Sequence, residues 1–211
     1  MIILIPSFNE LFSLKKLIVS LKEKKYNFLV IDDNSNDGTY QYLKKKKIFF
    51  IRNKKNLGYT KSLLKGFDYL VKSKYQYIFT MDADGEHKIQ YLDQFIKKLK
   101  KQKLDMIVGN RDRKNRFLEW LIGKIFYKIY KISDPLCGFR VYNKKKLSLI
   151  LKKINKNYFL TDIITEFDNL GFKYSEIKIK TNTLIGRKSR IGNVFISNLK
   201  ILNIMRLILK N

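Results

Sequence analysis

The sequence predicts an α/β fold in which a mostly parallel sheet is flanked by helices. Short apolar segments alternate with amphipathic segments from Met1 to Gly109, an order typical of parallel strands joined by helices. Four of the five apolar segments are followed by a polar cluster, and ligands bind at the carboxyl ends of strands in such sheets. The length of 211 residues fits one domain with a substantial core.

The first part of the chain supplies most of the predicted strands. Apolar runs predict strands at residues 1–5, 28–31, 48–51, 77–81 and 106–109. Apolar residues at helical spacing, such as Leu14, Leu17 and Leu21, predict helices at 11–24, 59–72 and 89–101, with a further helix before residue 48.

After Arg113 the regular alternation stops. An aromatic-rich amphipathic helix is predicted at 117–132, and a loop at 133–140 runs into a short strand. Helices near 145–152 and 159–170 and a strand at 174–179 follow. A basic loop is predicted at 182–193, where Gly186 and Gly192 favour mobility. We therefore expect one domain at 1–193 and an amphipathic C-terminal helix within 194–211.

Composition narrows the classes of partner and compartment. Lys and Arg number 45 against 18 Asp and Glu, a formal charge of +27, so nucleic acid, anionic lipid and phosphorylated substrates are candidate partners. Many of these lysines lie on predicted amphipathic helices, where they keep the exposed helix faces in contact with water and need not bind a partner. The single cysteine, Cys137, excludes an intramolecular disulfide framework and fits a reducing cytosol. We expect neither a signal peptide nor a transmembrane segment.

Two carboxylates separated by one alanine follow the strand at 77–81. Asp82 and Asp84 can converge on a hard cation with oxygen ligands, and Mg²⁺ or Mn²⁺ shared with a diphosphate fits them. A solvated turn is the alternative, because Asp and Gly also populate turns. Three other polar clusters lie on the same predicted sheet edge, which favours a site: Pro6–Glu10, Asp32–Thr39 and Asn110–Arg113.

These clusters together resemble the family 2 glycosyltransferases of GT-A fold, most of all the polyprenyl-phosphate (dolichol-phosphate) mannose and glucose synthases. The matching segments occur in family order and cover the chain from residue 2 to about residue 192. They are Ile5-Pro6-Ser7-Phe8-Asn9-Glu10, Val30-Ile31-Asp32-Asp33-Asn34-Ser35-Asn36-Asp37-Gly38-Thr39, Asn56-Leu57-Gly58, Met81-Asp82-Ala83-Asp84-Gly85-Glu86-His87, Gly109-Asn110-Arg111 and Asp134-Pro135-Leu136-Cys137-Gly138-Phe139-Arg140.

The resemblance implies roles for individual residues. Asp33 would reach the nucleotide base, and Asp82, Asp84 and Glu86 would form the metal site. Arg111 would lie near the sugar phosphate. The implied nucleotide-sugar pocket consists of Pro6, Phe8, Glu10, Ile31, Asp33, Asp82, Ala83, Asp84, Arg111, Arg187, Lys188 and Arg190.

Two features depart from the family pattern. The basic loop usually reads Arg followed by Gly-x-Ser-Lys, but here it reads Gly186-Arg187-Lys188-Ser189-Arg190. The role of phosphate clamp, in a loop that closes over the diphosphate, is therefore assigned to the loop and not to one residue. The C-terminal transmembrane helices of many relatives are not found in this sequence.

The implied reaction is inverting transfer of a sugar from a nucleotide diphosphate to a polyprenyl phosphate at the cytosolic face of the membrane. Such an acceptor is already ionised at neutral pH and needs no protein base. A glycan hydroxyl acceptor, in cell-surface polysaccharide synthesis, would need one. Asp162 is the first candidate base and Asp134 the second. The simpler roles are stabilisation of the helix dipole for Asp162 and an Asx turn for Asp134.

Other side chains near these motifs have simpler interpretations. His87 is either a metal or phosphate contact or a hydrogen-bond partner of the acids. Trp120 and Phe126 fit core or acceptor-groove packing, and Cys137 fits a small buried residue.

Two other functional classes fit the sequence less well. A non-catalytic polyanion-binding module would explain the charge, but no nucleic-acid motif is found and the acidic strand ends would repel phosphates. A nucleotidyltransferase would carry a Gly-rich loop after the first strand, which Pro6–Glu10 is not.

The segment Val194–Lys210 is apolar over most of its surface but carries basic residues. It fits a helix lying at an anionic membrane surface, which would make the protein cytoplasmic and peripheral to the membrane. A helix docked on the core or in a dimer is the alternative.

Overall fold

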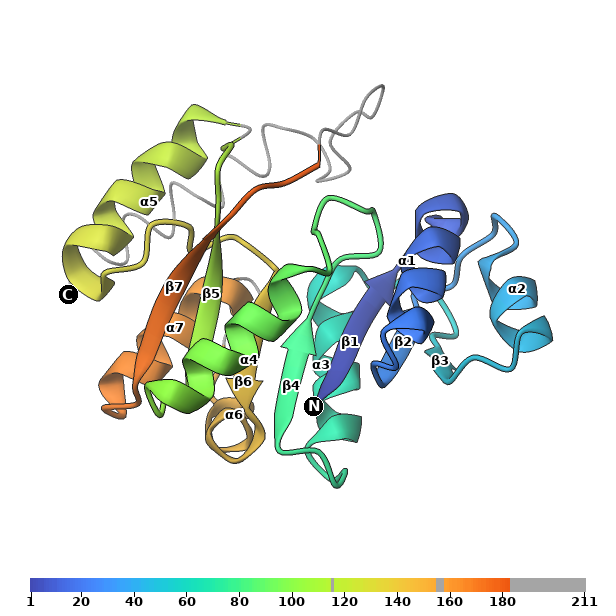
Figure 1. Cartoon of the computed structure of the whole chain (residues 1–211), viewed down its shortest axis with the longest axis horizontal. Helices are drawn as coiled ribbons and strands as arrows, with labels where there is room; N and C mark the ends of the chain where they lie inside the picture. The colour runs from blue at the N-terminus through green and yellow to red at the C-terminus, as the bar shows by residue number, and fades with distance from the viewer. Residues whose placement is uncertain (115, 155–157, 183–211) are drawn as a thin grey trace.

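The computed structural model describes residues 1–114, 116–154 and 158–182. They form a seven-stranded sheet with the order β3-β2-β1-β4-β6-β5-β7 (Figure 1). All neighbouring strands pair in parallel except β6, which is antiparallel to both β4 and β5. The predicted α/β class and mostly parallel sheet are confirmed. The strands are β1 Ile2–Ser7, β2 Phe28–Asp32, β3 Phe50–Arg52, β4 Tyr77–Thr80, β5 Met106–Arg111, β6 Arg140–Asn143 and β7 Tyr174–Ile179.

The helices follow the predicted ones to within a few residues. They are α1 Leu11–Glu23, α2 Thr39–Lys45, α3 Tyr59–Leu70, α4 Tyr91–Lys101, α5 Phe117–Tyr130, α6 Lys144–Ile150 and α7 Phe159–Asn169. β3 begins two residues later than expected: Ile48 is buried, but it follows the turn at 46–47 and does not join the sheet. Among the described residues, no helix is long and apolar enough to cross a membrane.

Helices cover both faces of the sheet, which explains why its strands are continuously apolar. On one face, Phe95 of α4 packs against Phe79 of β4, with ring centroids 5.4 Å apart. On the other face, Phe67 of α3 packs against Tyr142 of β6 at 5.6 Å. Gly66 brings α3 close to β1, since a Cβ there would lie 2.3 Å from the side chain of Leu4. Figure 1 shows α4 in front of the sheet and α3 and α7 behind it.

The direction of β6 brings one more loop to the carboxyl edge of the parallel strands. Because β6 is antiparallel, its amino end lies beside the carboxyl ends of β4 and β5. The Thr80 hydroxyl donates a 2.6 Å hydrogen bond to the Gly138 carbonyl at this junction. The loop 133–139 therefore lies at the sheet edge that the four polar clusters were predicted to share, next to the ends of β4 and β5.

The predicted helix at 194–210 and the loop residues Arg187, Lys188 and Arg190 lie outside the described residues. The domain division at residue 193 also lies there and remains a prediction.

Candidate active site

The loops after β1 and β2 interlock to form one wall of the candidate site. The Asn9 amide donates to the Ser35 hydroxyl at 3.0 Å, and the Asn36 amide donates to the Asn9 side chain at 2.9 Å. Asp37 accepts from the Leu11 amide at 2.8 Å and so caps α1, whose own N-cap residue makes no side-chain cap bond. Although burial opposes it, hydrogen bonds from Thr39 and the Leu11 amide lower the pKa of Asp37.

The nucleotide-pocket residues predicted from these segments divide into buried and accessible side chains. Pro6 and Ile31 are neighbours in the β1–β2 pairing and are both buried. Glu10 is also buried, whereas Phe8 is 40% exposed beside them. The structure thus brings these four residues to the same sheet edge.

Asp33 holds the loop that follows β3. Its buried carboxylate accepts hydrogen bonds from the Asn53 side chain at 2.7 Å and from the Leu57 and Gly58 amides at 2.8 Å each. Asp33 therefore braces this loop. The predicted contact with a nucleotide base remains a prediction.

We expect Asp33→Ala to weaken donor binding more than acceptor binding. A hydrogen bond to a charged group contributes about 1.5–3 kcal/mol, and the variant also releases the Leu57 and Gly58 amides. Calorimetric titration with nucleotide and with acceptor would measure the two affinities separately. Equal losses for both ligands would leave Asp33 with only the loop-bracing role.

The acidic segment after β4 places carboxylates where burial disfavours their charge. Burial raises the pKa of Asp82 and of Asp84, and the Asp82 charge raises that of Asp84 further. One buried oxygen of Asp82, Oδ1, has no hydrogen-bond partner within the described structure. A buried carboxylate oxygen without a donor is suited to a cation, so these two residues fit the predicted metal-binding role.

Gly138 and Tyr59 lie next to the Asp82 carboxylate. A Cβ at Gly138 would lie 2.5 Å from the Tyr59 hydroxyl and 3.1 Å from each carboxylate oxygen of Asp82. A side chain at position 138 would therefore crowd both groups, and glycine avoids this. Tyr59 has no role predicted from sequence, although it directly follows the Asn56-Leu57-Gly58 motif.

Glu86 is placed differently from the two aspartates. Its side chain lies 3.8 Å from Arg111. Burial raises its pKa to about 7, and the charges of Asp84 and Asp82 add to the rise, while Arg111 opposes it. Within the ranges that the structure describes, no three His, Cys, Asp or Glu side chains are arranged to hold a metal ion. The predicted three-carboxylate set is therefore not preassembled.

Arg111 is held by carboxylates on several sides. Its Nε and Nη2 donate to Asp134 at 2.8 and 3.1 Å, and its backbone amide donates to the same carboxylate at 3.1 Å. Glu119 of α5 lies 3.6 Å from Nη2. Bidentate pairing of this kind fixes both the position and the plane of the guanidinium. Glu119 could not be predicted as a site residue from sequence, because its contact with Arg111 depends on how α5 packs.

Asp134 forms a buried ion pair with Arg111. Burial by itself would raise its pKa, but the hydrogen bonds and charge of Arg111, with Lys114 nearby, keep that pKa below its usual value. A carboxylate held this way is a poor proton acceptor. Its contacts therefore favour a positioning role over that of a general base.

His87 and Cys137 are buried beneath the acidic segment. His87 lies 3.8 Å from Asp82 and 4.0 Å from the Cys137 sulfur, and its ring packs on Phe139 at 4.9 Å. Burial lowers the pKa of His87 to about 4 and raises that of Cys137 to about 12. Both are therefore neutral at pH 7, and Cys137 is a buried structural residue, as expected.

Asp162 lies in the first turn of α7 and is half-buried. The start of α7 is tied to the 135–138 loop by fully buried Arg140, which donates to the carbonyls of Leu160, Pro135 and Cys137 at 2.6–2.8 Å. Asp162 therefore lies in the first turn of a helix that is anchored to the loop beside Asp82. Its role as a base remains a prediction.

The chain leaving β7 is attached to the acidic segment. The Asn182 amide donates to the Glu86 carbonyl and its side chain donates to the Gly85 carbonyl, both at 2.9 Å. Asn182, the first residue of the predicted basic loop, therefore lies against the acidic segment that carries the predicted metal ligands.

A cavity of about 370 Å³ opens beside Arg111, between the end of β5 and helix α5. Its lining combines three cations, Arg111, Lys114 and Lys124, and one acid, Asp112, with the rings of Trp120 and Tyr127. Trp120 is 47% exposed there, whereas Phe126, on the inner side of α5, is fully buried in the core. Phe126 therefore occupies the core, one of the two predicted positions, and Trp120 lines this cavity. A role for Trp120 in an acceptor groove remains a prediction.

Comparison with known proteins agrees with this geometry. The family described as Glycosyl transferase family 2 matches residues 2–148. An uncharacterised protein of Methanocaldococcus jannaschii is 33% identical over 67% of this chain and 70% of its own. A UDP-N-acetylglucosamine–dolichyl-phosphate N-acetylglucosaminyltransferase of Methanococcus voltae is 22% identical over 85% of this chain and 84% of its own.

Among solved structures, glucosyl-3-phosphoglycerate synthase of Mycobacterium tuberculosis, in complex with Mn²⁺ and UDP-glucose, superposes with a TM-score of 0.75. The superposition covers 98% of this chain and 78% of that one at 13% identity, a likeness of fold. The family match spans well over half of the chain, as the order of its motifs predicts. The chain therefore belongs to glycosyltransferase family 2, with a GT-A fold.

Proposed function

We propose that this protein transfers a sugar, with inversion, from a nucleotide diphosphate to a polyprenyl phosphate at the inner face of the membrane. The observation that carries the proposal is that the carboxylates of Asp82 and Asp84 lie at the same carboxyl edge of the sheet as Arg111, whose guanidinium Asp134 holds in place. The relative from Methanococcus voltae, named for a dolichyl-phosphate acceptor, supports the lipid phosphate.

Asp82 and Asp84 would hold a Mg²⁺ or Mn²⁺ ion, with diphosphate oxygens completing its coordination. The unpartnered Oδ1 of Asp82 and the raised pKa of both carboxyls fit that role. When bound, the ion neutralises the leaving diphosphate. Glu86 lies next to the pair but contacts Arg111, so we assign it to the edge of the metal site.

Arg111 would bind the phosphate nearest the sugar. Asp134 holds its guanidinium before substrate arrives, so little reorganisation is needed when charge develops on the leaving group. Arg187, Lys188 and Arg190 would add further positive charge, and the attachment of Asn182 to Gly85 and Glu86 supports their proximity. Pro6, Phe8, Glu10, Ile31 and Asp33 would form the nucleotide wall.

The direct test is incubation of the full chain with labelled nucleotide sugars, polyprenyl phosphate and Mg²⁺ or Mn²⁺. Label should enter the organic phase and should stop doing so in excess EDTA. Transfer that persists in EDTA would contradict the metal mechanism. Binding of polyanions that survives EDTA, without any transfer, would instead support the basic binding module that the +27 charge allows.

A glycan hydroxyl is the second candidate acceptor, favoured by the half-buried Asp162 at the start of α7. Asp162→Asn distinguishes the two acceptors. With a lipid phosphate, kcat should change less than about threefold, because the nucleophile is already ionised. With a hydroxyl, loss of a general base should lower kcat about 10²–10⁴-fold. Initial rates with each acceptor, at saturating donor, decide between them.

A further inference from the structure

We propose that the outer face of α5 is a docking surface for an anionic lipid bilayer. This assigns membrane contact to a helix in the middle of the chain, in addition to the C-terminal segment suggested by the sequence. Its link to a lipid acceptor rests on the proposed function, but docking itself does not.

The outer face of α5 exposes large aromatic rings in a row. Phe117 is 72% exposed, Trp120 47% and Tyr127 52%, while Ile122 and Phe126 on the inner face are fully buried. Positions 117, 120 and 127 fall on one side of a helix. The rings of Phe117 and Trp120 stack with centroids 5.6 Å apart. Tryptophan and tyrosine are favoured at membrane interfaces, where one end of the ring is apolar and the other wet.

Lysines accompany this aromatic row. Lys124 lies over the Trp120 ring at 5.5 Å, and Lys131 lies over the Tyr127 ring at 5.8 Å. Exposed Lys128 adds a third cation. The one acid in α5, Glu119, is buried and faces Arg111. The outer face therefore carries aromatic rings and positive charge, a combination suited to anionic headgroups over an apolar interior.

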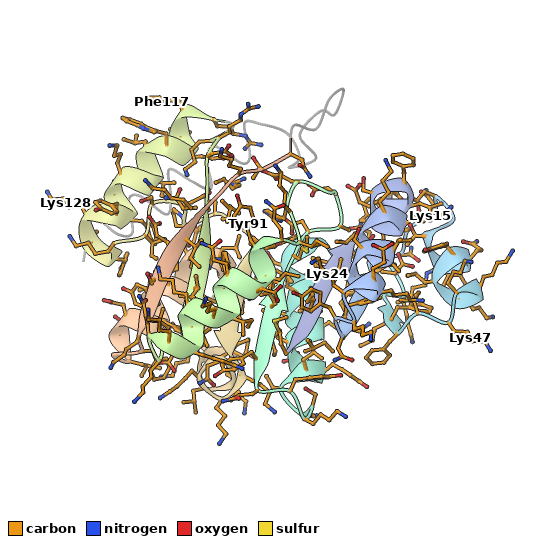
Figure 2. All side chains as sticks on the ribbon, viewed as in Figure 1. Lys15, Lys24, Lys47, Tyr91, Phe117 and Lys128 are labelled. Atoms are coloured by element: carbon orange, nitrogen blue, oxygen red, sulfur yellow. The ribbon has the colours of Figure 1, made fainter. Side chains whose placement is uncertain are left out.

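Charge decides between the possible occupants of this surface. A second copy of the chain would bring like-charged lysines together, which disfavours association. The C-terminal segment carries Lys200, Arg206 and Lys210 and no acid from residue 191 onward, so it would also be repelled. An anionic bilayer matches both the aromatic row and the lysines. Figure 1 places α5 at one end of the long axis of the molecule, and Figure 2 shows Phe117 and Lys128 on its outer side.

Docking through α5 would also orient the active site. The 370 Å³ cavity runs from Trp120 and Tyr127 to Arg111 and Lys114. If the acceptor is a lipid phosphate, its headgroup would enter from the bilayer through this cavity and meet Arg111. Under this arrangement the polyprenyl chain need not leave the membrane.

Trp120 is the only tryptophan in the chain, so its fluorescence reports on this surface alone. With full-length protein, vesicles containing phosphatidylglycerol should shift its emission to the blue, and lipids brominated in the acyl chains should quench it. Neutral phosphatidylcholine vesicles should do neither. Because no sugar donor is present, a failure here is distinct from a failure of the transfer assay.

Two pairs of matched variants locate the contact. Lys128→Glu/Lys131→Glu should weaken vesicle binding at least about tenfold, while Lys45→Glu/Lys46→Glu at α2, at the opposite end of the molecule, should retain wild-type binding. Phe117→Ser should weaken binding, whereas Phe12→Ser, at an equally exposed ring of α1 (73%), should not.

Several results would overturn the proposal. Equal losses in the control variants would show that only overall charge matters. Protection of Trp120 from iodide before any vesicle is added would show that the chain itself, or a second copy, covers α5. An equal blue shift with polyuridylate, in the absence of lipid, would assign the surface to nucleic acid.

Discussion

Asp84→Asn is expected to lower the rate of sugar transfer at least about 100-fold, comparable to losing one main charge-stabilising group in other active sites. Folding should not suffer. Burial and the Asp82 charge raise the pKa of Asp84, so its ionised form is disfavoured in the folded protein. Removing that charge should leave the melting temperature unchanged or raise it. Initial rates at saturating Mg²⁺ or Mn²⁺, together with thermal unfolding without metal, measure both effects.

Asp68→Asn is the matched control for this experiment. Asp68 is exposed on α3, far from the acidic segment, and the variant should retain both activity and stability. Full activity in Asp84→Asn would remove Asp84 from the metal site. A drop in melting temperature without loss of activity would make it a structural acid.

Asp134→Asn should be the most destabilising single change in the site. Removing one partner of a buried ion pair typically costs about 3–5 kcal/mol, because the other charge is left uncompensated. Glu119 and Glu86 remain 3.6 and 3.8 Å from Arg111, so we expect the lower end of that range. Transfer should fall as well, since the guanidinium loses its bidentate partner. Urea unfolding and initial rates, again with Asp68→Asn as control, test both parts.

The pH dependence of stability gives an independent check on this ion pair. The pKa of Asp134 is lower in the folded protein than in the unfolded chain, where it is about 3.9. Its stabilising contribution is therefore present above the unfolded pKa and lost as pH falls through the folded one. The difference in unfolding free energy between wild type and Asp134→Asn should be constant near neutral pH and narrow below about pH 4. A difference that does not change with pH would assign the destabilisation to packing.

Local sequence determined most of the fold, because each element carries its own pattern. The apolar run predicted as a strand at residues 1–5 is buried in β1 from Ile2 onward, although β1 also continues to Ser7, and the leucines of α1 face the core at helical spacing. The carboxylates of Asp82 and Asp84 also followed from sequence, since a strand end fixes where its next few residues lie. The order of the same motifs in the sequence also indicated the family.

The contacts between elements depended on tertiary structure. The antiparallel direction of β6 brings Gly138 against Asp82, and no local pattern near Arg140–Asn143 encodes that direction. Asp134 was a candidate base in the sequence. Arg111, 23 residues earlier in the chain, donates a hydrogen bond to the Asp134 carboxylate, and this contact is visible only in the tertiary structure. Glu119, Tyr59 and Asn182 likewise become site residues through packing alone. The sequence by itself thus determined the chemistry available at the sheet edge, while the long-range contacts decided which acids face a ligand and which hold an arginine in place.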